Sequence, residues 1–225
     1  MKKLIVFLAA LSLISCSDDD GNKTKNLFLE SLTIVSPGNG GGGGAIEFTY
    51  NDDKQLKSLS GNGTDFTIGY DEGRIISVHS SGSNGINYEL GYQDGKLTTL
   101  TKDGTEYEVT LSNDGKTYTI AGLERAFTVN EDNDVASITE GTTAYPFIYD
   151  NKYKGPMYSV KAENIFVLQF LLSAPYIFSR RPASDFLTYT AQNTYNSDGY
   201  LQKAVLVISG QTEPSATIYY NYTEL

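Results

Sequence analysis

Apolar and polar residues alternate in short stretches along most of the chain. In residues 88–92, for example, Tyr88, Leu90 and Tyr92 alternate with Glu89 and Gly91. Strict alternation sends one set of side chains to each face of an extended strand. The pattern therefore predicts many short β-strands that each have one apolar and one polar face.

Several of these stretches run into the same phrase: an aromatic or aliphatic residue, any residue, Tyr or an aliphatic, and then a turn rich in Asn and Asp. The third position of the phrase falls at Tyr50, Tyr70, Tyr92, Leu111, Val129, Tyr149 and Tyr195. The steps between these positions are 20, 22, 19, 18, 20 and 46 residues. Asn, Asp and Gly favour tight hairpin turns because they accept left-handed backbone angles. A repeat near twenty residues with such turns predicts a series of β-hairpins.

A second pattern follows the turns, where two apolar residues stand three positions apart. The pairs are Leu56 with Leu59, Ile75 with Val78, Leu97 with Leu100, and Val135 with Ile138. A step of three breaks the alternation of a regular strand. Either a β-bulge turns the second residue inward or the first residue lies at the margin of the turn, and the sequence leaves both interpretations open.

The long last step of 46 residues contains an insertion at about residues 153–187. Residues 162–174 within it are apolar on nearly every side and long enough for a helix. Asn164 could cap the start of this helix, and Pro175 would stop it. Because a helix that is apolar all round must be buried, we expect the insertion to plug or cover the sheet.

Together these patterns predict an all-β fold. It is an antiparallel meander of repeated hairpins with roughly fourteen to sixteen short strands, curled or closed into a barrel, with one helical insertion. Strands that span a membrane need about 9 to 11 residues and an apolar outer face. The shorter stretches here carry their polar set outward, which is not typical of a membrane porin.

The chain begins with a processing segment. Two lysines precede an apolar run, and Leu13-Ile14-Ser15-Cys16 looks like a bacterial lipobox, in which Cys16 becomes the lipidated first residue. We expect residues 1–15 to be a lipoprotein signal peptide, residues 16–26 the lipidated cysteine with an acidic tether, and residues 27–225 a single β-repeat domain. The alternative is an ordinary secretory signal with a chance cysteine. Because two or more acyl chains hold a protein firmly to a membrane, the lipobox predicts a lipid anchor in the membrane.

The net charge and the scarcity of His and Cys limit the partners and the catalytic or metal sites that the chain can have. The chain has 17 Lys and Arg against 27 Asp and Glu, a formal net charge of −10, which disfavours a nucleic-acid partner. His79 is the sole histidine and Cys16 the sole cysteine. This excludes the commonest zinc sites and the usual Ser-His and Cys-His nucleophile pairs, so we predict no cofactor, metal or catalytic residue, and we expect His79 to face solvent on a strand. Residues 130–134 offer oxygens that calcium would accept, but they lack the Gly and distal Glu of an EF-hand loop.

Two family resemblances can be stated from these motifs. Tyr70-Asp71-Glu72-Gly73-Arg74-Ile75 is similar to the tyrosine-aspartate repeats of the Rhs kind, although Leu111 and Val129 stand where that pattern has Tyr. The whole chain resembles a family of Bacteroidota surface lipoproteins of unknown function with a porin-like fold. The features that carry this second resemblance are the lipobox, the acidic Ser17–Asp20, the Phe48–Asn51 entry, Tyr149–Lys152 before the insertion, and Thr194–Tyr200. The resemblance implies a β-fold protein anchored in the outer membrane and exposed at the cell surface, and it transfers no binding or catalytic residues.

Seventeen tyrosines and no tryptophan are the remaining lead to a ligand. Many tyrosines occupy inward positions of the repeat, where a large aromatic side chain is more often core than ligand platform. Those in and beside the insertion are less constrained by the pattern, and two arginines stand among them. The predicted ligand-binding residues are Tyr153, Tyr158, Tyr176, Arg180, Arg181 and Tyr189.

The predicted function is a non-catalytic cell-surface lipoprotein that serves as a binding module for a glycan or an envelope component, including an envelope protein. The alternative is an envelope structural or assembly lipoprotein with no soluble ligand. A glycoside hydrolase is a third class, because two carboxylates can perform that reaction without histidine. An open groove lined by tyrosines would favour the first class, and a sealed barrel the second.

Overall fold

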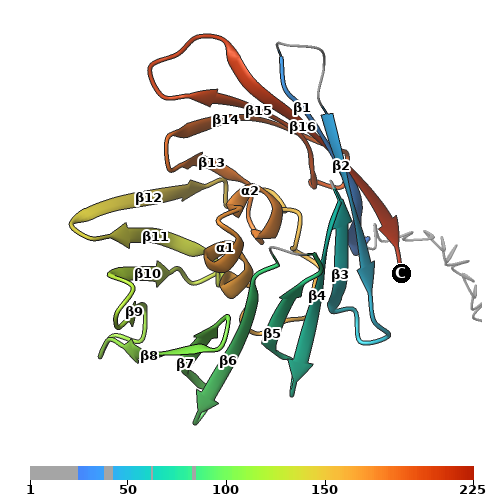
Figure 1. The fold of residues 1–225 in the computed structure, drawn as a ribbon. Helices are drawn as coiled ribbons and strands as arrows, with labels where there is room; N and C mark the ends of the chain where they lie inside the picture. Colours follow the sequence, from blue (N-terminus) through green and yellow to red (C-terminus); the bar gives the residue numbers. More distant parts are fainter. Residues whose placement is uncertain (1–24, 38–42, 62, 83–84) are drawn as a thin grey trace, which may run out of the picture.

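The computed structural model describes residues 25–37, 43–61, 63–82 and 85–225, so Cys16 and the predicted signal peptide lie outside the described residues. The described part forms a closed antiparallel barrel of sixteen strands with two short helices in its interior (Figure 1). Each strand pairs with its neighbours in sequence, and β1 pairs with β16 to close the ring. This confirms the predicted all-β meander and shows that it closes.

The strands are short and follow one another with brief turns. They are β1 (Leu27–Val35), β2 (Gly43–Tyr50), β3 (Leu56–Gly61), β4 (Thr64–Asp71), β5 (Arg74–Ser80), β6 (Asn87–Gln93), β7 (Lys96–Lys102), β8 (Thr105–Leu111), β9 (Thr117–Ile120), β10 (Arg125–Val129), β11 (Val135–Glu140), β12 (Thr143–Tyr149), β13 (Ala183–Phe186), β14 (Tyr189–Tyr195), β15 (Leu201–Ile208) and β16 (Pro214–Glu224).

The repeated phrase lies where even-numbered strands β2 to β14 end. At this end of the barrel each even-numbered strand leads into the next odd-numbered strand, and we call it the turn end. We call the other end the opposite mouth. Asp94 and Gly95 between β6 and β7 both have positive φ, 50° and 74°. Two successive positive φ angles are the geometry that tight hairpins require, which explains the Asp-Gly in the phrase.

A β-bulge follows the turn in most repeats and resolves the spacing of three. Tyr70 pairs with Ile75 while Gly69 pairs with Ser77, so Ile76 is the extra residue of the bulge. The same register shift brings Val129 opposite Val135 and Tyr195 opposite Leu201. The bulge turns the second apolar residue inward, so that both members of each pair are buried.

The insertion between β12 and β13 fills the interior of the barrel (Figure 1). It contains two helices, α1 (Phe166–Leu172) and α2 (Pro175–Phe178), where the sequence predicted one over residues 162–174. Ser173 ends α1 with a left-handed backbone angle (φ 49°), and Pro175 occupies the first turn of α2, where proline is favoured. The prediction that Asn164 caps α1 is wrong, since Ile165 is the N-cap and no side chain caps it.

Aromatic packing attaches α1 to the barrel wall. Phe170 stacks on Phe127 of β10 with ring centroids 4.4 Å apart, and Phe166 lies 5.4 Å from Tyr118 of β9. These residues belong to one core that joins the inward faces of the strands to the insertion. The interior is therefore packed with side chains, as in a globular core.

The outer face of the barrel carries the polar set. On β8, for example, Glu106, Glu108 and Thr110 are exposed while Val109 is buried. This arrangement differs from the apolar outer band of a membrane-spanning barrel. In the described ranges neither helix has the length and apolar character needed to cross a membrane.

Candidate ligand-binding cleft

Three hydrogen bonds attach the insertion to β-bulges of the barrel. In each, the main-chain N–H group of a residue at the bulge donates to an oxygen atom of the insertion. The donor and acceptor pairs are Ile75 N with Asn164 Oδ1 at 2.8 Å, Val135 N with Gln169 Oε1 at 2.5 Å, and Leu201 N with Lys154 O at 2.9 Å. Asn164 and Gln169 are both buried. Their role as partners of distant strands explains why Asn164 does not cap α1.

The carbonyl groups of the same three bulge residues accept hydrogen bonds from tyrosines on the next even-numbered strand. Tyr92, Tyr149 and Tyr222 donate their hydroxyls to Ile75 O, Val135 O and Leu201 O at 2.8, 2.7 and 2.8 Å. Burial raises the pKa of all three hydroxyls above the ordinary value, so they remain donors at neutral pH. The tyrosine of the repeat thus supplies a hydrogen-bond donor as well as an apolar ring.

The fully buried carboxylate of Asp134 binds the segment that leads from the insertion back into strand β13. It accepts hydrogen bonds from the main-chain N–H groups of Arg180 and Arg181, at 2.7 and 2.8 Å, and from Gln169 Nε2 at 2.7 Å. Burial raises the pKa of Asp134 to about 6, although these hydrogen bonds oppose the shift.

The possibility that residues 130–134 hold calcium finds no support in the geometry. The side-chain oxygen of Asn130 accepts from the main-chain N–H groups of Asp132 and Asp134, both at 3.0 Å, and Asp132 itself pairs with Arg181. The acidic loop is therefore a hydrogen-bonded turn. Within the part of the chain that the structure describes, no group of three acidic, His or Cys side chains could hold a metal ion.

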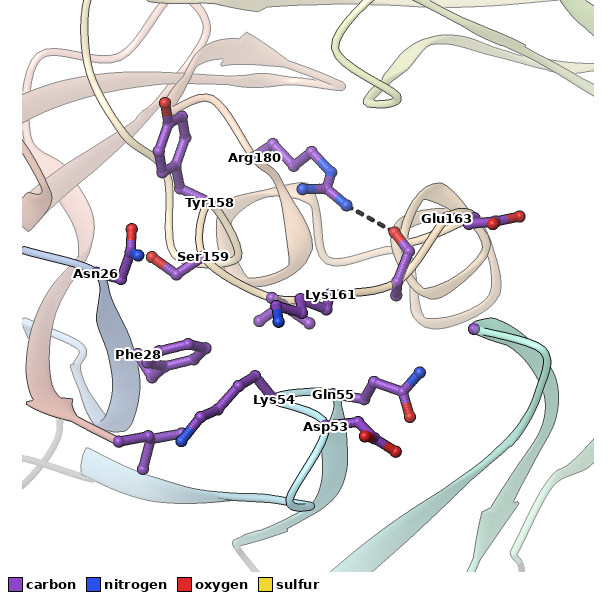
Figure 2. A pocket seen from close by; sticks show the side chains of 14 residues that line it. Asn26, Phe28, Asp53, Lys54, Gln55, Tyr158, Ser159, Lys161, Glu163 and Arg180 are labelled. Atoms are coloured by element: carbon purple, nitrogen blue, oxygen red, sulfur yellow. Dashed lines mark hydrogen bonds between the residues drawn. The ribbon is translucent and has the colours of Figure 1, made fainter.

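A cleft of about 800 Å³ opens at the turn end, between the insertion and the first strands (Figure 2). Its floor is the irregular segment 158–163, and its walls are the β2–β3 turn and the start of β1. Main-chain hydrogen bonds fix the floor to the turns, from Lys161 N to Lys54 O at 3.0 Å and from Glu163 N to Gly73 O at 3.1 Å. The labelled lining residues are Asn26, Phe28, Asp53, Lys54, Gln55, Tyr158, Ser159, Lys161, Glu163 and Arg180.

Tyr158 lines this cleft, and two cationic side chains lie over its ring. The Lys154 ammonium lies 5.5 Å and the Arg181 guanidinium 5.4 Å from the ring centroid. Tyr200 meets the same ring edge-on at 6.1 Å. Tyr158 nevertheless keeps 36% of its surface exposed, which leaves ring area available to a ligand.

The structure divides the predicted ligand-binding residues between the two ends of the barrel. Tyr158 and Arg180 line the cleft, and Arg181 lies beside them through its contact with the Tyr158 ring. Tyr153 stacks on Tyr195 at 3.7 Å, and its carbonyl accepts from Arg181 Nη1 at 3.3 Å.

The other two predicted residues lie apart from this group. Tyr176 and Tyr189 line a smaller pocket of about 350 Å³ at the opposite mouth, with Phe186 and Leu206. The predicted set is therefore not a single site. Sequence reasoning missed Lys54 and Lys161, because one lies in a repeat turn and the other in the insertion, and only the closed barrel brings both to one cleft.

His79 is remote from this cleft. It lies on β5, where Nε2 is 3.1 Å from Glu89 Oε1 and Nδ1 is 3.2 Å from Asn87 Oδ1, with 44% of its side-chain surface exposed. It is a surface residue that pairs across two strands.

Comparison with known proteins identifies the fold. No protein-family model matches the chain, and no curated protein matches it in sequence. A porin-like protein from Bacteroides vulgatus ATCC 8482 has a similar structure, with a TM-score of 0.50 and 11% identity over 88% of this chain and 100% of that one. A porin-like protein from Bacteroides uniformis ATCC 8492 gives a TM-score of 0.49 and 13% identity over 87% and 98% of the two chains. At such identity the likeness concerns the architecture of the barrel.

Proposed function

We propose that this protein is a non-catalytic binding module of the bacterial cell envelope that holds a glycan in the turn-end cleft. The cleft carries the proposal. It combines an exposed aromatic ring at Tyr158 with amide, hydroxyl and charged side chains on an open, solvent-accessible depression. Sugars offer apolar C–H faces that stack on aromatic rings and hydroxyl groups that pair with such polar side chains.

The envelope location is supported by two independent features. The Leu13–Cys16 lipobox predicts a lipid on Cys16, and the Bacteroides vulgatus protein of similar fold is called porin-like. The polar outer face of this barrel favours attachment through a lipid and the tether of residues 16–26 over insertion of the strands into a bilayer. In this proposal the domain is held at the outer membrane and faces the cell exterior.

A glycan array with three proteins tests the binding role. Tyr158→Ala removes the exposed ring of the cleft, and Tyr189→Ala removes a tyrosine of the pocket at the opposite mouth. We expect wild type and Tyr189→Ala to bind the same glycans, and Tyr158→Ala to lose roughly tenfold or more in affinity, as expected for a central aromatic contact. Equal binding by Tyr158→Ala would place the ligand away from this cleft, and no binding by wild type would reject the glycan-binding role.

The packed interior favours a second function, an envelope structural or assembly lipoprotein with no soluble ligand. The insertion fills the barrel, so its bulk serves stability and leaves only the surface depressions for binding. Pull-down from solubilised envelopes separates the two functions. Stable recovery of one envelope protein by both wild type and Tyr158→Ala, without glycan binding, would support the assembly role.

A further inference from the structure

We propose that the ligand of the turn-end cleft is an acidic glycan, whose uronate or sulfate group is held by Arg180, Lys54 and Lys161. The inference rests on the proposed function, because it assigns the chemical class of the ligand in the same cleft. It follows from the hydrogen bonds and ion pairs that the cationic side chains of the cleft form with the rest of the protein.

The guanidinium of Arg180 is only partly satisfied by the protein. Its Nη2 donates to Ala162 O at 2.6 Å, whereas its buried Nε has no hydrogen-bond partner among the described residues (Figure 2). The adjacent Arg181 differs, since its Nε and Nη2 both donate to Asp132 Oδ1 at 3.0 Å. Because Nε is buried, an anion in the cleft can pair only with the outer nitrogens of this guanidinium, which interacts with Asp134 and Asp132 at longer range and forms an ion pair with neither.

Two further cations, Lys54 and Lys161, line the cleft. Within the described ranges, neither Lys54 nor Lys161 forms an ion pair, and neither does Arg180. The chain as a whole has ten more acidic than basic residues, so three such cations at one cleft are a local reversal of charge. A cleft lined by one sign of charge concentrates ligands of the opposite sign.

The acidic residues of the cleft do not cancel this charge. Glu163 is neutralised by Arg74, whose Nε lies 2.8 Å from Glu163 Oε2. Asp53 is exposed in the β2–β3 turn, where water screens it. The three cations therefore exceed the acidic charge that remains.

Aromatic surface beside the cations favours a sugar acid over a bare anion. Tyr158 lines the same cleft with 36% of its surface exposed, whereas Phe28 at the cleft is buried in the core. An acidic sugar uses both the cations and the exposed ring, because its carboxylate or sulfate pairs with the cations and its own ring lies against Tyr158.

Matched acidic and neutral ligands test the inference. The probes are oligogalacturonate with its methyl ester, and a sulfated galactan oligosaccharide with its desulfated form, each titrated calorimetrically into the purified protein. We expect at least one acidic probe to bind roughly tenfold or more tightly than its neutral partner, and this preference to shrink at high salt. The two pairs also show whether uronate or sulfate is the preferred group.

Variants then assign the preference to the cleft. Lys54→Gln with Lys161→Gln, and separately Arg180→Gln, are expected to lower the affinity for the acidic probe more than the affinity for its neutral partner, so that the preference falls roughly tenfold. Lys96→Gln with Lys152→Gln is the control, because both lysines are exposed near the turn end and outside the cleft lining. If Arg180→Gln does not fold, the lysine pair decides, since both lysine side chains lie at the surface of the cleft.

The outcomes separate the two proposals. Equal affinity for acidic and neutral probes, or an unchanged preference in the folded Lys54 and Lys161 double variant, overturns the acidic assignment and leaves glycan binding intact. Binding to no probe and no array glycan overturns both.

Discussion

Gln169→Met tests whether the insertion holds the barrel through buried hydrogen bonds. The fully buried Gln169 side chain accepts from Val135 N at 2.5 Å and donates to Asp134 Oδ1 at 2.7 Å and to Phe178 O at 3.1 Å. Methionine has similar length and flexibility but makes none of these bonds. The substitution therefore removes the polar contacts while keeping most of the volume.

The expected cost follows from the groups left without partners. The Val135 N–H and the Phe178 carbonyl lose the Gln169 hydrogen bonds, and an unsatisfied buried group costs about 1 to 3 kcal/mol. The more apolar methionine offsets roughly 1 kcal/mol of this. We expect the free energy of unfolding to fall by about 1 to 5 kcal/mol, a range whose centre lies well above the change of about 1 kcal/mol that is typical of point substitutions.

Urea unfolding followed by circular dichroism measures this effect. With a slope of about 2 kcal/mol per molar urea, the unfolding midpoint should fall by roughly 0.5 to 2.5 M. The loss should be larger at pH 7.5 than at pH 5, because the ionised Asp134 carboxylate loses one of its three donors and is protonated at the lower pH. Gln192→Met is the control, since Gln192 is exposed on β14 and its substitution should change stability by less than about 0.5 kcal/mol. A Gln169→Met midpoint equal to that of the control would refute the reasoning.

Three further predictions concern Asp134, the repeat tyrosines and the anchor. The pKa of Asp134 is raised from 3.8 to about 6, so the native state binds more protons than the unfolded state between these values. The contribution of Asp134 to the free energy of unfolding therefore falls as the pH rises from about 4 to 6, by at most about 3 kcal/mol. Urea titrations of wild type and Asp134→Asn across this range should show wild type gaining relative stability at the acidic end, and a constant difference would contradict the prediction. Tyr149→Phe leaves the Val135 carbonyl without its hydroxyl donor and should lower the free energy of unfolding by about 1 to 3 kcal/mol, against less than about 0.5 kcal/mol for the exposed Tyr219→Phe, as measured by thermal and urea unfolding. Cys16→Ala should abolish labelling by a fatty-acid analogue in cells, and labelling equal to wild type would reject the lipid anchor.

The hairpins could be predicted from the sequence because their signals are local. Alternation, the Asp-Gly turns and the recurrent Tyr all act within one repeat, and the structure places Tyr50, Tyr149 and Tyr195 as the last residues of their strands. The bulges could be suspected from the spacing of three. Their presence, however, depends on the register with the preceding strand, as at Tyr70 and Ile75.

The features that sequence reasoning missed depend on partners far away in the chain. Asn164 fits the local rule for a helix cap, but its amide instead contacts Ile75, which lies 89 residues earlier. Buried main-chain groups need partners wherever the fold places them, and this requirement outweighed local capping. The cleft also depends on contacts between distant parts of the chain. Lys54 and Lys161 are brought together by the main-chain hydrogen bond from Lys161 N to Lys54 O.

The seam between β1 and β16 has a consequence for how the chain folds. It pairs Leu27 with Glu224, so the ring closes only when its last strand is available. Contacts between residues so distant in sequence slow folding, because the intervening chain must be ordered first. Until closure, β1 and β15 are open edges that other chains can pair with. A molecule of this topology therefore passes through an aggregation-prone state, and its last strand limits how long that state persists.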